Sequence, residues 1–133
     1  MKGDIIMPSP ELKIRQFQHE IDTWKRNLEF LLQENVNLKN RLAEVLQTVQ
    51  DDDILEAAET FQSEFLREDE AIQILRGDIA KQDHLLTREI YENGYIIKDV
   101  VRQQKKLSEG VKNVVSGFNK LKFDFNSYLG EVL

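Results

Sequence analysis

Three long stretches of this chain repeat apolar residues at alternating spacings of three and four, and this periodicity predicts an all-α fold. In the first stretch ten of eleven such positions are apolar, and a similar stripe recurs twice more. Residues spaced in this way lie on one face of an α-helix, which is the face that packs against neighbouring helices. Both prolines, Pro8 and Pro10, lie near the N-terminus, so no later residue forbids a helix.

Two breaks in the repeat predict where the helices end. The first falls at residues 51–53, where Asp53 is the predicted cap of a new helix and Glu56 completes a capping box. The second precedes Asn93 and Gly94, a pair typical of helix ends. One continuous helix with a local register shift is the alternative at this second break.

Three helices of nearly equal length joined by tight turns favour an antiparallel, up-down-up bundle of long coiled-coil-like helices. The apolar stripe is wider than two positions per heptad, which suits a bundle better than an isolated two-stranded coil. We predict a flexible arm over residues 1–9, a single bundle domain over 10–133, and helices over about 10–51, 53–92 and 95–131.

Four polar side chains interrupt the apolar stripes and are candidates for setting the register of the helices. They are Asn35, Glu68, Gln82 and Gln104. In an antiparallel bundle with these turns, Asn35 falls beside Glu68 and Gln82 beside Gln104. Polar residues that meet in a core disfavour wrong pairings, although half-exposed side chains would explain the same pattern.

Five apolar residues have no place in the stripes, should face outward, and form the candidate interaction face. They are Phe30, Val36, Ile74, Tyr91 and Phe123. Scattered exposed apolar residues are common, but two outward phenylalanines in so polar a chain favour a binding surface. Gly110 and Gly117, seven residues apart, would let another backbone approach closely.

Charge and composition exclude several classes of function. The formal net charge is −6, which argues against nucleic acid or an anionic membrane as the partner. No apolar run is long enough to span a membrane, and the absence of cysteine excludes thiolate metal sites and suits a cytoplasmic location. Acids gather in residues 51–70 and bases in residues 98–122, which indicates either solvated faces that help the helices pair or a docking surface for a basic partner.

No catalytic, cofactor or metal site is expected, because the two histidines, His19 and His84, should point outward in different directions. The segment His19-Glu20-Ile21-Asp22-Thr23 is similar to the phosphoacceptor box of sensor histidine kinases, which implies His19 as a phosphate acceptor. It departs from that box at Asp22, where the family has a basic residue, and at Trp24, where it has proline.

The first stripe resembles a leucine zipper, with Asn35 as its polar member, but no basic segment precedes it. The resemblance implies that this helix could pair in parallel with its copy in a dimer. We therefore expect a cytoplasmic, non-enzymatic interaction module (an adaptor, scaffold or assembly subunit) that acts on protein partners and forms a homodimer. The alternative is a helical chaperone, similar to secretion or flagellar export chaperones, with a groove that stays open without its client. A His19 phosphotransfer protein is the third hypothesis.

Overall fold

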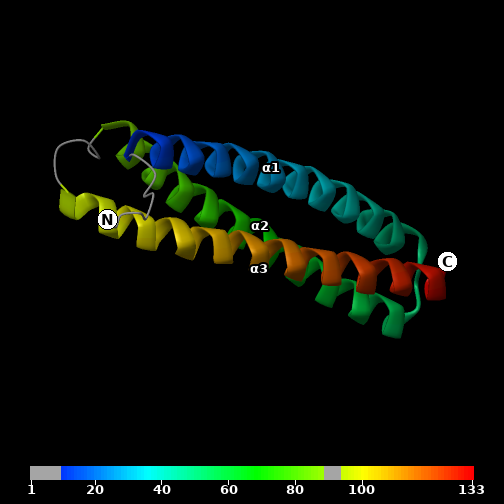
Figure 1. Ribbon diagram of the computed structural model, residues 1–133. Helices are drawn as coiled ribbons and strands as arrows, with labels where there is room; N and C mark the ends of the chain where they lie inside the picture. Colours follow the sequence, from blue (N-terminus) through cyan, green and yellow to red (C-terminus); the bar gives the residue numbers. More distant parts are fainter. Residues whose placement is uncertain (1–9, 89–93) are drawn as a thin grey trace.

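The computed structural model describes residues 10–88 and 94–133 of the chain, and these residues form three packed helices without a strand. They are α1 over Pro10–Thr48, α2 over Asp52–Arg88 and α3 over Gly94–Val132 (Figure 1). The prediction of an all-α three-helix bundle is confirmed. In the part of the chain described here, no helix has the length and apolarity that crossing a membrane requires.

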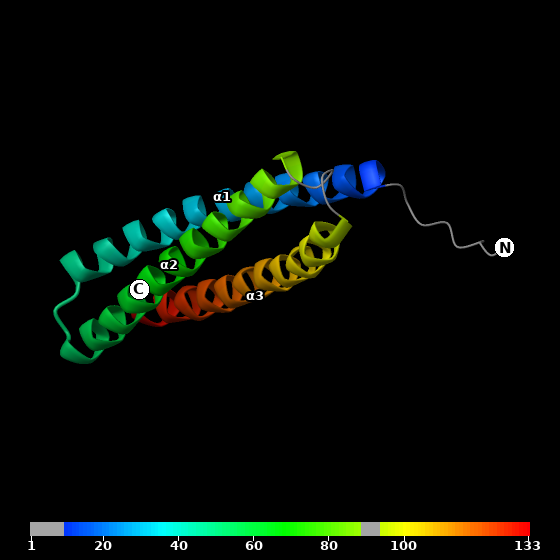
Figure 2. The same cartoon turned by 90° about the vertical axis from the view of Figure 1, so that its left-hand side faces the viewer.

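Neighbouring helices along the chain run in opposite directions (Figure 1). Lys25 of α1 pairs with Asp83 of α2 at 2.7 Å, whereas Lys39 pairs with Asp69, so residue numbers rise along α1 as they fall along α2. Figure 2 shows the C-terminus at the same end of the bundle as the connection between α1 and α2. As a result α1 and α3 lie side by side in the same direction.

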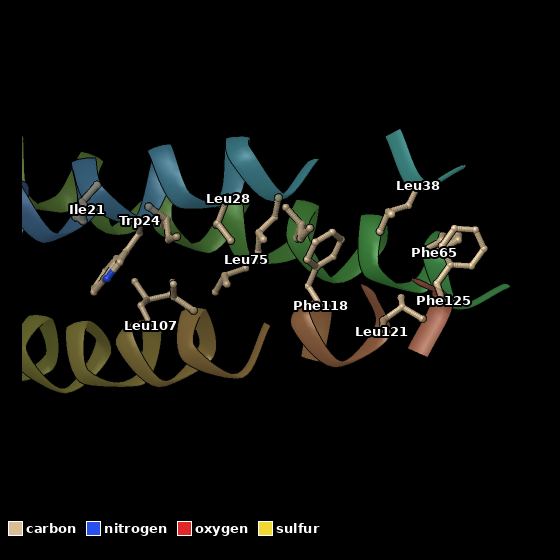
Figure 3. Packing of buried hydrophobic residues seen from close by; sticks show 14 of the residues in the cluster. Ile21, Trp24, Leu28, Leu38, Phe65, Leu75, Leu107, Phe118, Leu121 and Phe125 are labelled. Atoms are coloured by element: carbon tan, nitrogen blue, oxygen red, sulfur yellow. The ribbon is translucent and has the colours of Figure 1, made fainter. Parts of the chain in front are cut away.

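The heptad stripes form the core of the bundle. The apolar residues of α1 at alternating spacings of three and four, from Ile14 to Val45, are each at most 8% exposed. Residues from all three helices meet along the axis (Figure 3). Burying one large apolar side chain stabilises a fold by about 1.5–3 kcal/mol. The stripe that resembles a leucine zipper is therefore already occupied within one chain, so parallel pairing of α1 with a copy through this stripe is excluded in this fold.

The connection between α1 and α2 spans residues 49–51 and is longer than the single residue predicted, and the cap of α2 is a different aspartate. The Oδ1 atom of Asp51 accepts hydrogen bonds from the backbone N–H of Asp53, at 2.9 Å, and of Ile54, at 3.3 Å. Asp51 is thus the cap, and the prediction of Asp53 with Glu56 is wrong. Asp51 is the last residue before α2, so its carboxylate can reach N–H groups of the first turn, which have no partner within the helix. Asp53 already lies inside this first turn.

The second predicted boundary falls between α2 and α3, which are separate helices that run in opposite directions. The alternative of one continuous helix is therefore wrong. The expected end of the second helix at residue 92 and Asn93 lie outside the described residues, as does the arm over 1–9.

The two glycines predicted to allow close approach act between α2 and α3 of the same chain. A Cβ atom at Gly110 would lie 3.2 Å from Cδ1 of Leu75, and one at Gly117 would lie 3.4 Å from Oε1 of Glu68. The missing side chain at Gly110 thus lets α3 lie close to Leu75 of α2, whereas at Gly117 a Cβ atom would be near an ordinary contact distance.

Candidate functional site

Two glutamines form a polar layer that joins all three helices. Gln82 donates through Nε2 to Oε1 of Gln104 and to the backbone carbonyl of Val100, both at 3.0 Å. Gln104 in turn donates to the carbonyl of Phe17 at 3.2 Å and to Glu20 at 2.9 Å. Both glutamines are buried, and they are neighbours as the sequence predicted. A buried network of this kind disfavours a shifted register, because a shift would leave its polar atoms without partners.

In the second polar layer, Asn35 contacts Asp69 and not the predicted Glu68. Asn35 is fully buried and donates to the carbonyl of Phe65 at 2.9 Å and to Oδ1 of Asp69 at 2.7 Å. Lys39 donates to the other carboxylate oxygen of Asp69. The predicted partner, Glu68, makes no hydrogen bond with Asn35. Asp69 lies on the flank of α2 that faces α1, whereas Glu68 faces α3.

Glu68 is a half-buried carboxyl group in the seam between α2 and α3. Its Oε2 atom is buried and has no hydrogen-bond partner in the described part of the chain. Burial raises the pKa of this carboxyl group above its ordinary value, and the nearby charge of Asp69 raises it further.

Four of the five residues of the candidate interaction face are exposed, as expected. Phe123 is 71% exposed, Phe30 61%, Ile74 60% and Val36 42%. Tyr91 lies outside the described residues. Large apolar side chains at this exposure gain nothing from the core, so they are available to a partner.

The exposed residues do not gather on one surface, because Phe30 and Val36 lie on opposite flanks of α1. Phe30 precedes Glu34 by one turn, and Glu34 accepts a hydrogen bond from Lys122 of α3 at 3.2 Å. Val36 precedes Lys39 by one turn, and Lys39 faces α2. The interaction face is therefore several separate patches.

One of these patches includes a residue that the sequence reasoning missed, Leu66, which is 55% exposed. The hydrogen bond from Asn35 to the carbonyl of Phe65 brings the next residues, Val36 and Leu66, to the same height along the bundle. Each lies three residues before a member of the ion pair between α1 and α2. Leu66 falls outside the apolar stripe of α2, and this position in the sequence could have identified it as an exposed residue.

A groove of about 560 Å³ lies between α1 and α3. Trp24 reaches from α1 toward α3 at this place (Figure 3) and is 8% exposed. Two contacts between the helices, Glu20 with Gln104 and Glu34 with Lys122, lie at the two ends of the groove. The groove is lined by Thr23, Trp24, Asn27, Ser108, Val111, Lys112, Val115, Ser116 and Asn119.

Short side chains line the facing flanks of α1 and α3 along the groove. Between its two end contacts the flank of α1 carries Asn27, and the facing flank of α3 carries Ser108 and Val115. The seam between α1 and α2 also has a hollow, of about 510 Å³, but long charged side chains such as Lys25 and Arg76 line it. The sequence reasoning missed the groove, because its presence depends on the distance between α1 and α3.

The histidines lie on different helices, and both are exposed. Among residues 10–88 and 94–133, no three His, Asp or Glu side chains converge in a way that could hold a metal ion. Comparison of the chain with protein-family models, with curated proteins and with solved structures gave no match.

Proposed function

We propose that this chain is a non-enzymatic interaction module that binds other proteins through helix contacts. The observation that carries this proposal is the set of large apolar side chains on the outer surface of a bundle whose core is already filled. Phe30, Ile74 and Phe123 are each at least 60% exposed. Covering one such side chain contributes about 1.5–3 kcal/mol, so a partner gains affinity wherever it buries them.

The internal polar layers support the same function, because they give the bundle one defined register. The side-chain N–H groups of Gln82, Gln104 and Asn35 donate to acceptors within the chain. Binding surfaces on such a scaffold keep a fixed relative position, which reduces the entropy lost on binding. The proposal includes a cytoplasmic location and protein rather than nucleic-acid partners, which the acidic, cysteine-free composition supports. It also includes a homodimer, which the exposed apolar side chains support.

The test compares three tagged baits in native lysate after mild cross-linking and mass spectrometry. The wild-type chain should capture a recurrent partner, and Phe30→Glu with Phe123→Glu should lose it. The matched control, Gln33→Glu with Asn126→Glu, adds the same charge at exposed positions of the same helices and should retain it. Capture that is equal in all three baits would contradict the proposal.

The groove between α1 and α3 favours a second candidate, a chaperone that holds an amphipathic helix of its client. Such a protein needs a groove that stays open without the client, and this seam leaves one of about 560 Å³. A chaperone protects its client from aggregation, whereas an adaptor does not. Light scattering of a captured partner, alone and with this chain, separates the two.

A further inference from the structure

We propose that the groove between α1 and α3 binds one amphipathic helix of a partner protein whose apolar stripe is bordered by Asp and Glu. This inference rests on the proposed function and assigns it a site and a class of partner. A helix in this groove would contact two parallel helices at once and complete a four-helix arrangement.

The floor of the groove supplies apolar contact to such a helix. It consists of Trp24, Val111 and Val115, whereas the walls are short polar residues that do not fill the space. Leucine or isoleucine side chains from an incoming helix can therefore reach the floor between the walls. The ends of the site are fixed by the two contacts between α1 and α3 described above.

The indole of Trp24 offers a polar contact in the same place. Within the described chain its Nε1 donates to no protein acceptor, and this nitrogen is not among the buried unpartnered atoms. It is therefore accessible to an acceptor from outside the chain. A carboxylate on the border of an incoming apolar stripe is a strong acceptor for such a donor.

The rim of the groove is basic, although the chain as a whole is acidic. Lys112 lines the groove, and Lys105 lies two turns earlier on the same side of α3. Among the described residues neither lysine forms an ion pair, and no residue that lines the groove is acidic.

This charge pattern selects an acidic helix and disfavours a second copy bound groove to groove. The two acids nearest to the groove ends, Glu20 and Glu34, already accept hydrogen bonds from Gln104 and Lys122. Two copies that met through this face would place lysines opposite lysines, and like charges across an interface oppose association.

A selection experiment identifies the preferred partner chemistry directly, whatever the natural partner is. The probe is a displayed library of tryptophan-free helices of about 20 residues, roughly 30 Å long, with a fixed Leu/Ile stripe and bordering positions varied among Glu, Lys and Ser. Selection on the full chain should enrich Glu at the borders. The enriched peptide should change the fluorescence of Trp24, the single tryptophan of the chain.

Charge reversal at the rim tests the position of the bound helix. Lys105→Glu with Lys112→Glu should raise the Kd of the enriched peptide about tenfold or more, since rim charges are among its attractive contacts. The matched control, Arg67→Glu with Lys81→Glu, reverses the same charge on exposed positions of α2 and should leave the Kd unchanged.

Several results would overturn the inference. They are the absence of any enriched helix, enrichment of Lys at the borders, a Kd that the rim variant does not change, and a dimer of this chain in which Trp24 is shielded before peptide is added. A lysate partner that is lost with Phe30→Glu and Phe123→Glu but kept by the rim variant would remove the groove assignment and leave the proposed function standing. Peptide binding as expected without any lysate partner would contradict the proposed function itself.

Discussion

Glu68 shows how one residue can make the stability of a bundle depend on pH. Its carboxyl group lies in the seam beside Gly117, and one oxygen is buried without a hydrogen bond. Burial, and then the charge of Asp69, raises the pKa of Glu68 in the folded chain above 4.5. Because the folded state holds this proton more tightly than the unfolded state, ionisation of Glu68 destabilises the fold above the raised pKa, and the cost disappears as the pH falls toward 4.5.

We expect Glu68→Gln to stabilise the chain at pH 7. The gain should be less than about 1 kcal/mol, because solvent partly screens this carboxylate, and it should shrink as the pH approaches 4.5. Urea unfolding at several pH values measures it. Glu70→Gln, at an exposed position of the same helix, should change the midpoint little. A gain for Glu68→Gln that stays constant down to pH 4.5 would show that the carboxylate is not destabilised by burial.

At the scale of the elements, the start of α2 depends on one side chain. Asp51→Ala should lower the free energy of unfolding by about 1 kcal/mol, since it removes the acceptor for two backbone N–H groups. Asp53→Ala removes only a charge near the positive end of the helix dipole, so its cost should be a few tenths of a kcal/mol. Thermal unfolding of both variants gives the comparison. A larger loss for Asp53→Ala would reverse the assignment of the cap.

The sequence predicted the helices well because heptad spacing specifies which side of each helix is buried. It predicted both breaks in the chain and the contact of Gln82 with Gln104 for the same reason. It did not single out Asp51, because three consecutive aspartates can each cap, and the choice depends on where the backbone leaves α1. It placed Glu68 rather than Asp69 beside Asn35, because periodicity does not specify the relative height of two helices to one residue.

The candidate site was less accessible to sequence reasoning than the fold. Exposure of Phe30 and Phe123 followed from their places outside the stripes. The groove beside Trp24 depends on the distance between α1 and α3. The spacing of residues within one helix does not determine that distance. The same limit explains why the outward residues were grouped as one face, although α1 places Phe30 and Val36 on different flanks.

At the scale of the whole molecule, acidic residues are concentrated at one end of the bundle. Residues 51–70 carry nine acids and one base, and they lie at the end that holds the α1–α2 connection (Figure 2). Two lysines near the end of α3 pair with other acids, because Lys122 pairs with Glu34 and Lys120 with Asp124. Most of this acidic end therefore stays uncompensated and faces solvent.

The expected homodimer can be tested on the patch formed by Val36 and Leu66, which is distinct from the groove. Sedimentation equilibrium should give the mass of two chains for the wild type and of one chain for Leu66→Glu, because the substitution places an unpaired charge in an apolar contact. Ser63→Glu adds the same charge at an exposed neighbouring turn and should remain a dimer. The mass of one chain for the wild type at all concentrations would contradict the expectation of a homodimer.

The seam between α1 and α3 has a consequence for the order in which the chain folds. Its hydrogen bonds join residues 84 to 88 positions apart, whereas Gln82 and Gln104 are only 22 apart. Closing the longer loop costs more entropy, and few contacts compensate for it at this seam. We therefore expect the two hairpins that share α2 to form early and the α1–α3 seam to close last. A partner helix that arrives during synthesis would then meet this seam before it closes, so assembly can begin while the chain is still folding.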